Sequence, residues 1–115
     1  MRSTAVQTLM LALLILLPSF ATAQTHRASV RGTIGDPSKA VVSGAEITFT
    51  NTSTNESRTA TSDADGEYAV SALPAGVYRV QVSSPGFAAH VHESLALTVN
   101  QELRLDITLL VAGPN

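Results

Sequence analysis

The sequence contains no cysteine and no tryptophan, and only 4% of its 115 residues are aromatic. The lack of cysteine excludes disulfides, thiolate metal sites and a cysteine nucleophile. Charged residues are also sparse, at 14% of the chain. Seven of them are basic and nine are acidic, which gives a formal net charge of -2. Nucleic-acid binding normally requires an excess of positive charge, so we expect no nucleic-acid partner. The length allows one domain, whose stability must come from burial of apolar side chains.

The first 23 residues have the three parts of a secretory signal peptide. Arg2 supplies a positive charge, residues 9–17 form an unbroken apolar run, and Ala21-Thr22-Ala23 is a small-residue cleavage site before Gln24. The apolar run is well short of the roughly 20 residues that span a membrane. We therefore predict a signal peptide over residues 1–23, a mature domain over 24–115, and no transmembrane segment after cleavage.

Beyond Gln24, short runs alternate between apolar and polar residues, with turn residues between them. No run shows the 3.6-residue spacing of an amphipathic helix. The pattern predicts an all-β domain, a β-sandwich of seven short strands. Five strands are expected over residues 28–35, 45–51, 57–62, 67–72 and 77–83. The last two strands are expected in two further alternating runs. One contains Leu95, Leu97 and Val99, and the other contains Leu103, Leu105, Ile107 and Leu109.

Two segments of this pattern are candidates for a functional role, one as an edge strand and the other as a turn. Segment 57–62 has little to bury, so we expect it at a sheet edge, where it could present its backbone to a partner. Asp63, Asp65 and Gly66 form the strongest turn signal in the chain. Asp-Gly supports positive φ, which predicts a hairpin turn here. The same residues are similar to the start of a calcium-binding loop, but that pattern needs a glutamate at its twelfth position, which is Pro74.

Several short motifs together resemble the carboxypeptidase regulatory-like domain. They are VRGTI at 30–34, VSGAEI at 42–47, TSDADGEY at 61–68, LPAGVY at 73–78 and PGF at 85–87. The resemblance covers about residues 28–111. It implies a seven-stranded Greek-key sandwich of the prealbumin-like (transthyretin-like) type, grouped with carbohydrate-binding-like folds, that has no catalytic residues and binds no cofactor.

The variety that this chain most resembles is the N-terminal periplasmic extension of TonB-dependent outer-membrane transporters. The sequence has no TonB box, plug or barrel, so the resemblance does not carry transport activity with it. We expect either a free-standing module or a truncated N-terminal domain of such a receptor. The resemblance implies an exported protein, in the periplasm, at the outer membrane or secreted, with a protein partner at the cell envelope.

His90 and His92 are the candidate metal ligands. Their i, i+2 spacing would place both imidazoles on one face of a strand. A zinc site needs three or four convergent ligands, and Glu93 would point to the opposite face of a regular strand. His26 is the remaining histidine. We therefore predict no metal site and treat the pair as solvated histidines.

Carbohydrate binding is the alternative function, and it normally uses an exposed aromatic platform. The alternation assigns Phe49, Tyr68 and Tyr78 to the inward face, and Phe87 is expected to close one end of the core. Enzyme activity is not expected, because no serine lies in a Gly-x-Ser-x-Gly motif and the histidines lie outside the well-patterned strands. The expected function is a non-catalytic interaction module.

Overall fold

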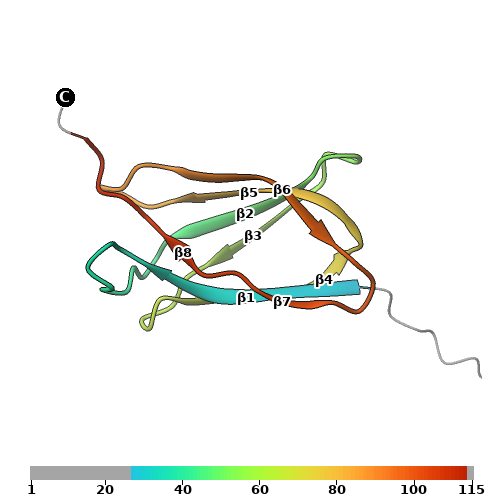
Figure 1. Cartoon of the computed structure of the whole chain (residues 1–115), viewed down its shortest axis with the longest axis horizontal. Coiled ribbons are helices and arrows are strands. Elements are labelled where there is room, and N and C mark those ends of the chain that lie inside the picture. The colour runs from blue at the N-terminus through green and yellow to red at the C-terminus, as the bar shows by residue number, and fades with distance from the viewer. Residues whose placement is uncertain (1–26, 114–115) are drawn as a thin grey trace, which may run out of the picture.

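The computed structural model describes residues 27–113, and all regular secondary structure in this range is β-strand (Figure 1). The predicted signal peptide lies outside the described residues. Within them, no helix is long and apolar enough to cross a membrane. The eight strands are β1 (Arg27–Gly35), β2 (Glu46–Asn51), β3 (Ser57–Thr61), β4 (Glu67–Pro74), β5 (Gly76–Ser83), β6 (His90–Leu97), β7 (Glu102–Arg104) and β8 (Ile107–Thr108).

The strands form two sheets that face each other across one core, as Figure 1 shows. One sheet, which we call the β5 sheet, has the order β3-β2-β5-β6, and every neighbouring pair in it is antiparallel. The other, the β1 sheet, has the order β4-β1-β7, and β8 also pairs with β1. The predicted all-β sandwich is therefore confirmed.

The β5 sheet follows the alternation of the sequence closely. β2 pairs with β5 without interruption from Glu46↔Ser83 to Asn51↔Tyr78. Ile47 and Phe49 are fully buried, as predicted, and so are their partners Val82 and Val80. Cross-strand pairs of this kind hold a sheet and its buried face together.

The β1 sheet departs from the prediction at its C-terminal side. A single last strand was expected, but the structure splits it into β7 and β8, which both run parallel to β1. The break falls at Leu105 and Asp106. The Leu105 carbonyl lies directly over Gly32, where a Cβ would overlap it, and the Asp106 side chain takes the place of a backbone acceptor for the Thr33 amide, with an N–O distance of 2.9 Å.

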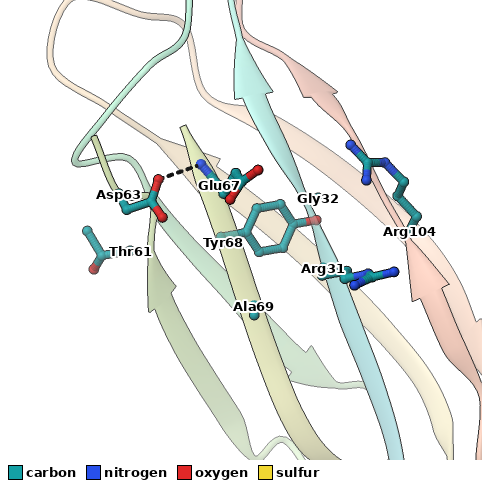
Figure 2. A pocket seen from close by; sticks show the side chains of 8 residues that line it. All are labelled: Arg31, Gly32, Thr61, Asp63, Glu67, Tyr68, Ala69 and Arg104. Carbon is teal, nitrogen blue, oxygen red and sulfur yellow. Dashed lines mark hydrogen bonds between the residues drawn. The ribbon is translucent and has the colours of Figure 1, made fainter. Parts of the chain in front are cut away.

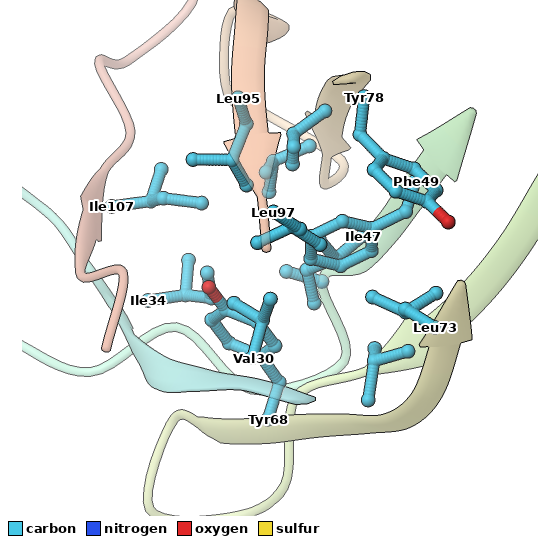
Figure 3. Packing of buried hydrophobic residues seen from close by; sticks show 14 of the residues in the cluster. Val30, Ile34, Ile47, Phe49, Tyr68, Leu73, Tyr78, Leu95, Leu97 and Ile107 are labelled. Carbon is cyan, nitrogen blue, oxygen red and sulfur yellow. The ribbon is translucent and has the colours of Figure 1, made fainter. Parts of the chain in front are cut away.

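Both sheets contribute to one hydrophobic core (Figure 3). Phe49 of the β5 sheet faces Tyr68 of the β1 sheet, with 6.4 Å between ring centroids and 38° between ring planes. Phe87 is half-buried and packs against the core, in line with its expected place at one end. Val99 is a correction to the predicted alternation. It lies in the turn after β6 and is 49% exposed, because the strand ends at Leu97.

Candidate functional site

The sandwich presents four sheet edges, and three of them are irregular. In β4, Ser71 and Ala72 both lie opposite Ser29, which is a β-bulge. In β6, Glu93 and Ser94 both lie opposite Arg79. The β7–β8 edge is broken at Leu105–Asp106. Bulges and breaks of this kind hinder the addition of a further strand.

The fourth edge, β3, is regular. It is an edge strand, as predicted, and pairs with β2 without a register shift from Thr50↔Ser57 to Glu46↔Thr61. Its residues are exposed except for Ala60, which is half-buried. β3 contains neither lysine nor proline, the residues that often protect an edge. Its free side is therefore the best-formed template for a further strand within residues 27–113.

The hydrogen bonds at both ends of β3 show which of its backbone groups point outward. The Asn51 amide donates to Glu56 at 2.8 Å, and the Ser62 amide donates to Ala45 at 2.9 Å. Because hydrogen-bonded and non-hydrogen-bonded pairs alternate along an antiparallel ladder, the inward-facing backbone groups between these ends belong to Arg58 and Ala60. The N–H and C=O groups of Ser57, Thr59 and Thr61 consequently point away from β2.

An arginine joins the β3 edge to the other sheet. The Arg58 guanidinium donates to the carbonyls of Ser71 at 3.2 Å and Ala72 at 3.4 Å, inside the bulge of β4. Arg27 donates to the same Ala72 carbonyl at 3.1 Å. These bonds satisfy carbonyls that the bulge removes from the ladder. Among residues 27–113, the backbone groups of Thr59 make no hydrogen bond with β4.

Asp63, Asp65 and Gly66 form a tight turn, but it is a corner rather than the predicted hairpin. It connects β3 of the β5 sheet to β4 of the β1 sheet, so the two strands have different partners. Asp63 Oδ1 accepts hydrogen bonds from the amides of Asp65 and Glu67, both at 2.9 Å. Gly66 has φ 74°, and a Cβ there would lie 2.7 Å from the Ile34 carbonyl oxygen. A hairpin and a corner can use the same local turn chemistry, and they differ only in whether the two strands pair with each other or with other strands.

The carboxylates of Asp63, Asp65 and Glu67 are exposed and come within 4.8 Å of one another. One oxygen of Asp63 is already occupied by two turn amides. The turn therefore accounts for the proximity of these three carboxylates, and we do not assign a cation to them.

His90 and His92 lie on one face of β6, as their spacing predicted. They are half-buried and pair with Val82 and Val80, whose side chains enter the core. Glu93 lies on the other face, where its carboxylate is 3.8 Å from the Arg79 guanidinium. Within residues 27–113, no third potential metal ligand lies close to the two histidines.

A surface hollow of about 390 Å³ lies over the outer face of the β1 sheet. We call it the outer recess. In Figure 2, Asp63 and Glu67 lie on its β4 side, and Arg31 and Arg104 lie on its β1 and β7 side. The residues that line it are Arg31, Gly32, Thr61, Asp63, Glu67, Tyr68, Ala69 and Arg104.

Asp106 organises the β7 side of the recess. Its Oδ1 accepts from the Thr33 amide and the Thr33 hydroxyl, both at 2.9 Å, and its Oδ2 accepts from Arg104 Nε at 3.1 Å. The hydrogen bond from the Thr33 amide is the main reason that the pKa of the Asp106 carboxyl lies below its ordinary value; Thr33 Oγ1 and Arg104 lower it further. Arg104 is thereby held in a defined position.

Tyr68 contributes to the floor of the recess but is not an exposed ring. It is 3% exposed, and its hydroxyl donates to the Leu105 carbonyl at 2.5 Å. Burial, with a smaller contribution from the charge of Asp106, raises the pKa of this phenol, so it stays protonated and remains a donor. Phe49 and Tyr78 are also buried, and Phe87 is half-buried against the core. The described residues therefore include no exposed aromatic platform of the kind that sugars stack on.

Arg31 and Arg104 were not predicted as a pair. They come from opposite ends of the domain and meet only because β7 pairs with β1 in parallel. Parallel pairing leaves no short-range mark comparable to a hairpin turn. Nothing in the sequence pattern could have identified this pair before the topology was known.

The chain matches the family model of the carboxypeptidase regulatory-like domain over residues 29–110. No curated protein sequence matches it. Among solved structures, catechol 1,2-dioxygenase from Acinetobacter radioresistens is similar at 10% identity with a TM-score of 0.64, covering 78% of this chain and 53% of that one. This chain thus spans about half the length of the dioxygenase.

Two further structures have the same fold. The Bacillus anthracis TIE protein is similar at 19% identity with a TM-score of 0.63, covering 75% of this chain and 17% of that one. A proposed carbohydrate-binding protein from Bacteroides uniformis is similar at 21% identity with a TM-score of 0.57, covering 71% of this chain and 40% of that one. At these identities the likeness shows the fold alone.

Proposed function

We propose that this chain, which belongs to the carboxypeptidase regulatory-like domain family, is a non-catalytic module that binds a protein partner through the free edge of β3. The observation that carries the proposal is the contrast among the four sheet edges. Three are bulged or broken, whereas β3 offers three successive outward-facing backbone positions, Ser57, Thr59 and Thr61. An extended segment of a partner would extend the β5 sheet by one strand, with affinity from main-chain hydrogen bonds.

Thr59→Pro tests this proposal. Proline removes the outward-facing N–H of residue 59 without removing a hydrogen bond between β2 and β3. We expect the wild-type domain to co-purify a partner from the native cell envelope and Thr59→Pro to lose it. Thr59→Ala, the matched control, keeps the N–H and should keep the partner. Circular dichroism should show the same β signal for all three proteins.

Three results would contradict the strand-edge mechanism. The first is a Thr59→Pro variant that retains the partner at wild-type yield. The second is a wild-type domain that co-purifies nothing above the level of an unfolded control. Loss of the partner in both variants would instead assign binding to the Thr59 side chain, which would also overturn backbone pairing.

We further propose that the protein is exported, with residues 1–23 removed as a signal peptide. The charged start, the apolar run and the small-residue site of the sequence support this. An antibody against residues 24–115 applied to fractionated cells tests it. A soluble periplasmic product that begins at Gln24 is expected for a free-standing module. A much heavier outer-membrane product is expected if the domain is the N-terminal part of a TonB-dependent receptor, and a cytoplasmic product with residue 1 intact would refute export.

Carbohydrate binding is the second candidate function. The outer recess offers arginine, carboxylate and hydroxyl groups that can bond sugar hydroxyls, and the Bacteroides uniformis neighbour is described as a proposed carbohydrate-binding protein. It takes second place because the aromatic rings of Phe49, Tyr68 and Tyr78 are buried. Titration of the domain with a panel of neutral glycans, followed by NMR, tests this function, and unchanged spectra across the panel would remove it.

A further inference from the structure

Two arginines lie side by side on the outer face of the β1 sheet. Arg31 of β1 and Arg104 of β7 are direct partners in the parallel register, and both are exposed. Neighbouring strands are about 4.8 Å apart. Like charges in directly opposed positions destabilise a sheet. The arrangement therefore has an unfavourable electrostatic component that an anion between the two guanidinium groups would relieve.

Among residues 27–113, acidic side chains pair with one of the two arginines. Asp106 binds Arg104 Nε at 3.1 Å, and Thr33 Oγ1 lies 3.4 Å from another of its guanidinium nitrogens. Arg31 makes no ion pair and no side-chain hydrogen bond with any other residue between 27 and 113. Arg104 is thus held in position with nitrogens to spare, and Arg31 has its whole guanidinium available.

There is room for a ligand beside Arg31. Its antiparallel partner in β4 is Ala69, whose small side chain leaves the outer recess of about 390 Å³ open. A second hollow of about 210 Å³ adjoins it and is also lined by Arg31 and Ala69, together with Ser29, Ser71 and the acidic Glu102. Figure 2 shows Arg31 extending from β1 and Arg104 from β7, with Asp63 and Glu67 on the β4 side.

The two ends of the recess differ in charge, and this restricts the ligand. The arginine end suits a planar carboxylate, which a guanidinium can bind through two parallel hydrogen bonds. The opposite end carries the carboxylates of Asp63 and Glu67, which repel a second negative charge and accept hydrogen bonds from hydroxyl groups. We propose that Arg31 and Arg104 form a binding site for a singly charged carboxylate that carries hydroxyl donors, as an acidic sugar does. The two arginines lie on β1 and β7 and not on β3, although Thr61 of β3 also lines the recess.

The direct test is an NMR titration of the ¹⁵N-labelled domain with sodium glucuronate at low ionic strength. We expect saturable shifts at millimolar concentrations of the Arg31 and Arg104 Nε–H signals and of the Thr33 amide. Glucose, which lacks the carboxylate, should cause none of them. Acetate, which lacks the hydroxyls, should cause weaker ones. The affinity should fall with added salt, because the charges are exposed.

Arg31→Gln should weaken glucuronate binding by about tenfold or more, the loss expected for a charge-assisted hydrogen-bonding pair. Arg79→Gln is the matched control. Arg79 is an exposed arginine on the outer face of the other sheet, near Glu93, and should leave the affinity unchanged. Since Arg31 has no partner among the described residues, its replacement should not affect folding, which thermal unfolding will verify.

Three outcomes would overturn the inference. Equal effects of Arg31→Gln and Arg79→Gln would show that the attraction is general and not local to the recess. Equal shifts with glucose and glucuronate would show that the carboxylate is not recognised. Tighter binding of inorganic phosphate than of glucuronate would show that the acidic end does not select for a single charge. None of these outcomes depends on whether a partner binds β3.

Discussion

The two sheets of this domain are built by different means. In the β5 sheet, all neighbours are antiparallel; β2 and β5 follow the apolar alternation of their own sequences without interruption, and β6 departs from it only at its bulge. In the β1 sheet, the two C-terminal strands run parallel to β1 and depend on a glycine, a tyrosine hydroxyl and an aspartate side chain to complete the ladder. The comparison teaches that local pattern is sufficient for a sheet whose strands pair in regular antiparallel registers. Where distant segments meet, single side chains decide the outcome.

Gly32→Ala should give the largest effect and would show how far the β1 sheet depends on one residue. The new Cβ would overlap the Leu105 carbonyl, so the β7–β8 segment must move away from β1. We expect a loss of about 3 kcal/mol in the free energy of unfolding, at the upper end of the usual range for steric overpacking. Urea unfolding followed by circular dichroism measures it. Gly113→Ala, where a Cβ meets nothing within 4 Å, is the control and should be near neutral. Similar stabilities for the two variants would contradict this account.

Tyr68→Phe and Tyr78→Phe compare a long-range with a short-range hydroxyl bond. Tyr68 donates across the β1 sheet to Leu105, whereas Tyr78 donates at 2.6 Å to Pro74, four residues away along the chain. Removing the first should cost about 1–2 kcal/mol, because the Leu105 carbonyl loses its donor where the ladder is interrupted. Removing the second should cost less. Hydrogen exchange should then quicken at the amides of 105 and 109 in Tyr68→Phe only; equal exchange in both variants would show that the Tyr68 bond does not hold β7 and β8.

Lowering the pH should destabilise the β1 sheet through protonation of Asp106. This should be the smallest of the three predicted effects on stability. Its folded pKa is lowered, chiefly by the Thr33 amide, so the carboxylate stabilises the fold above the ordinary aspartate pKa of 3.8. That contribution is lost as the pH falls through the lowered folded value. Since the Asp106 side chain is 54% exposed, we expect less than about 1 kcal/mol. Asp106→Asn should flatten this part of the stability-against-pH curve below pH 4, and an unchanged slope would show that Asp106 does not contribute.

Several features of the fold and the site could be predicted from residues that lie close together in the sequence. Ile47 and Phe49 alternate with polar residues and are buried, and segment 57–62 has too little apolar surface for an interior strand and is an edge. The turn at Asp63 and Gly66 was visible, because Asx chemistry and positive φ are local. Its role as a corner was not, because that depends on which strands β3 and β4 find as partners. The bulge that places His90 and His92 toward Val82 and Val80 was likewise hidden.

By itself, the sequence determined the all-β class, most strand positions, the buried apolar positions of the core and the family, because each rests on spacing along the chain. Only the tertiary structure decided that the last predicted strand divides at Leu105 and Asp106, that β3 is the regular edge among the four, and that Arg31 stands beside Arg104. The physical reason is the same in each case. These features depend on contacts between segments far apart in the chain, and the alternation of apolar and polar residues specifies which face a side chain occupies but not which strand lies beside it.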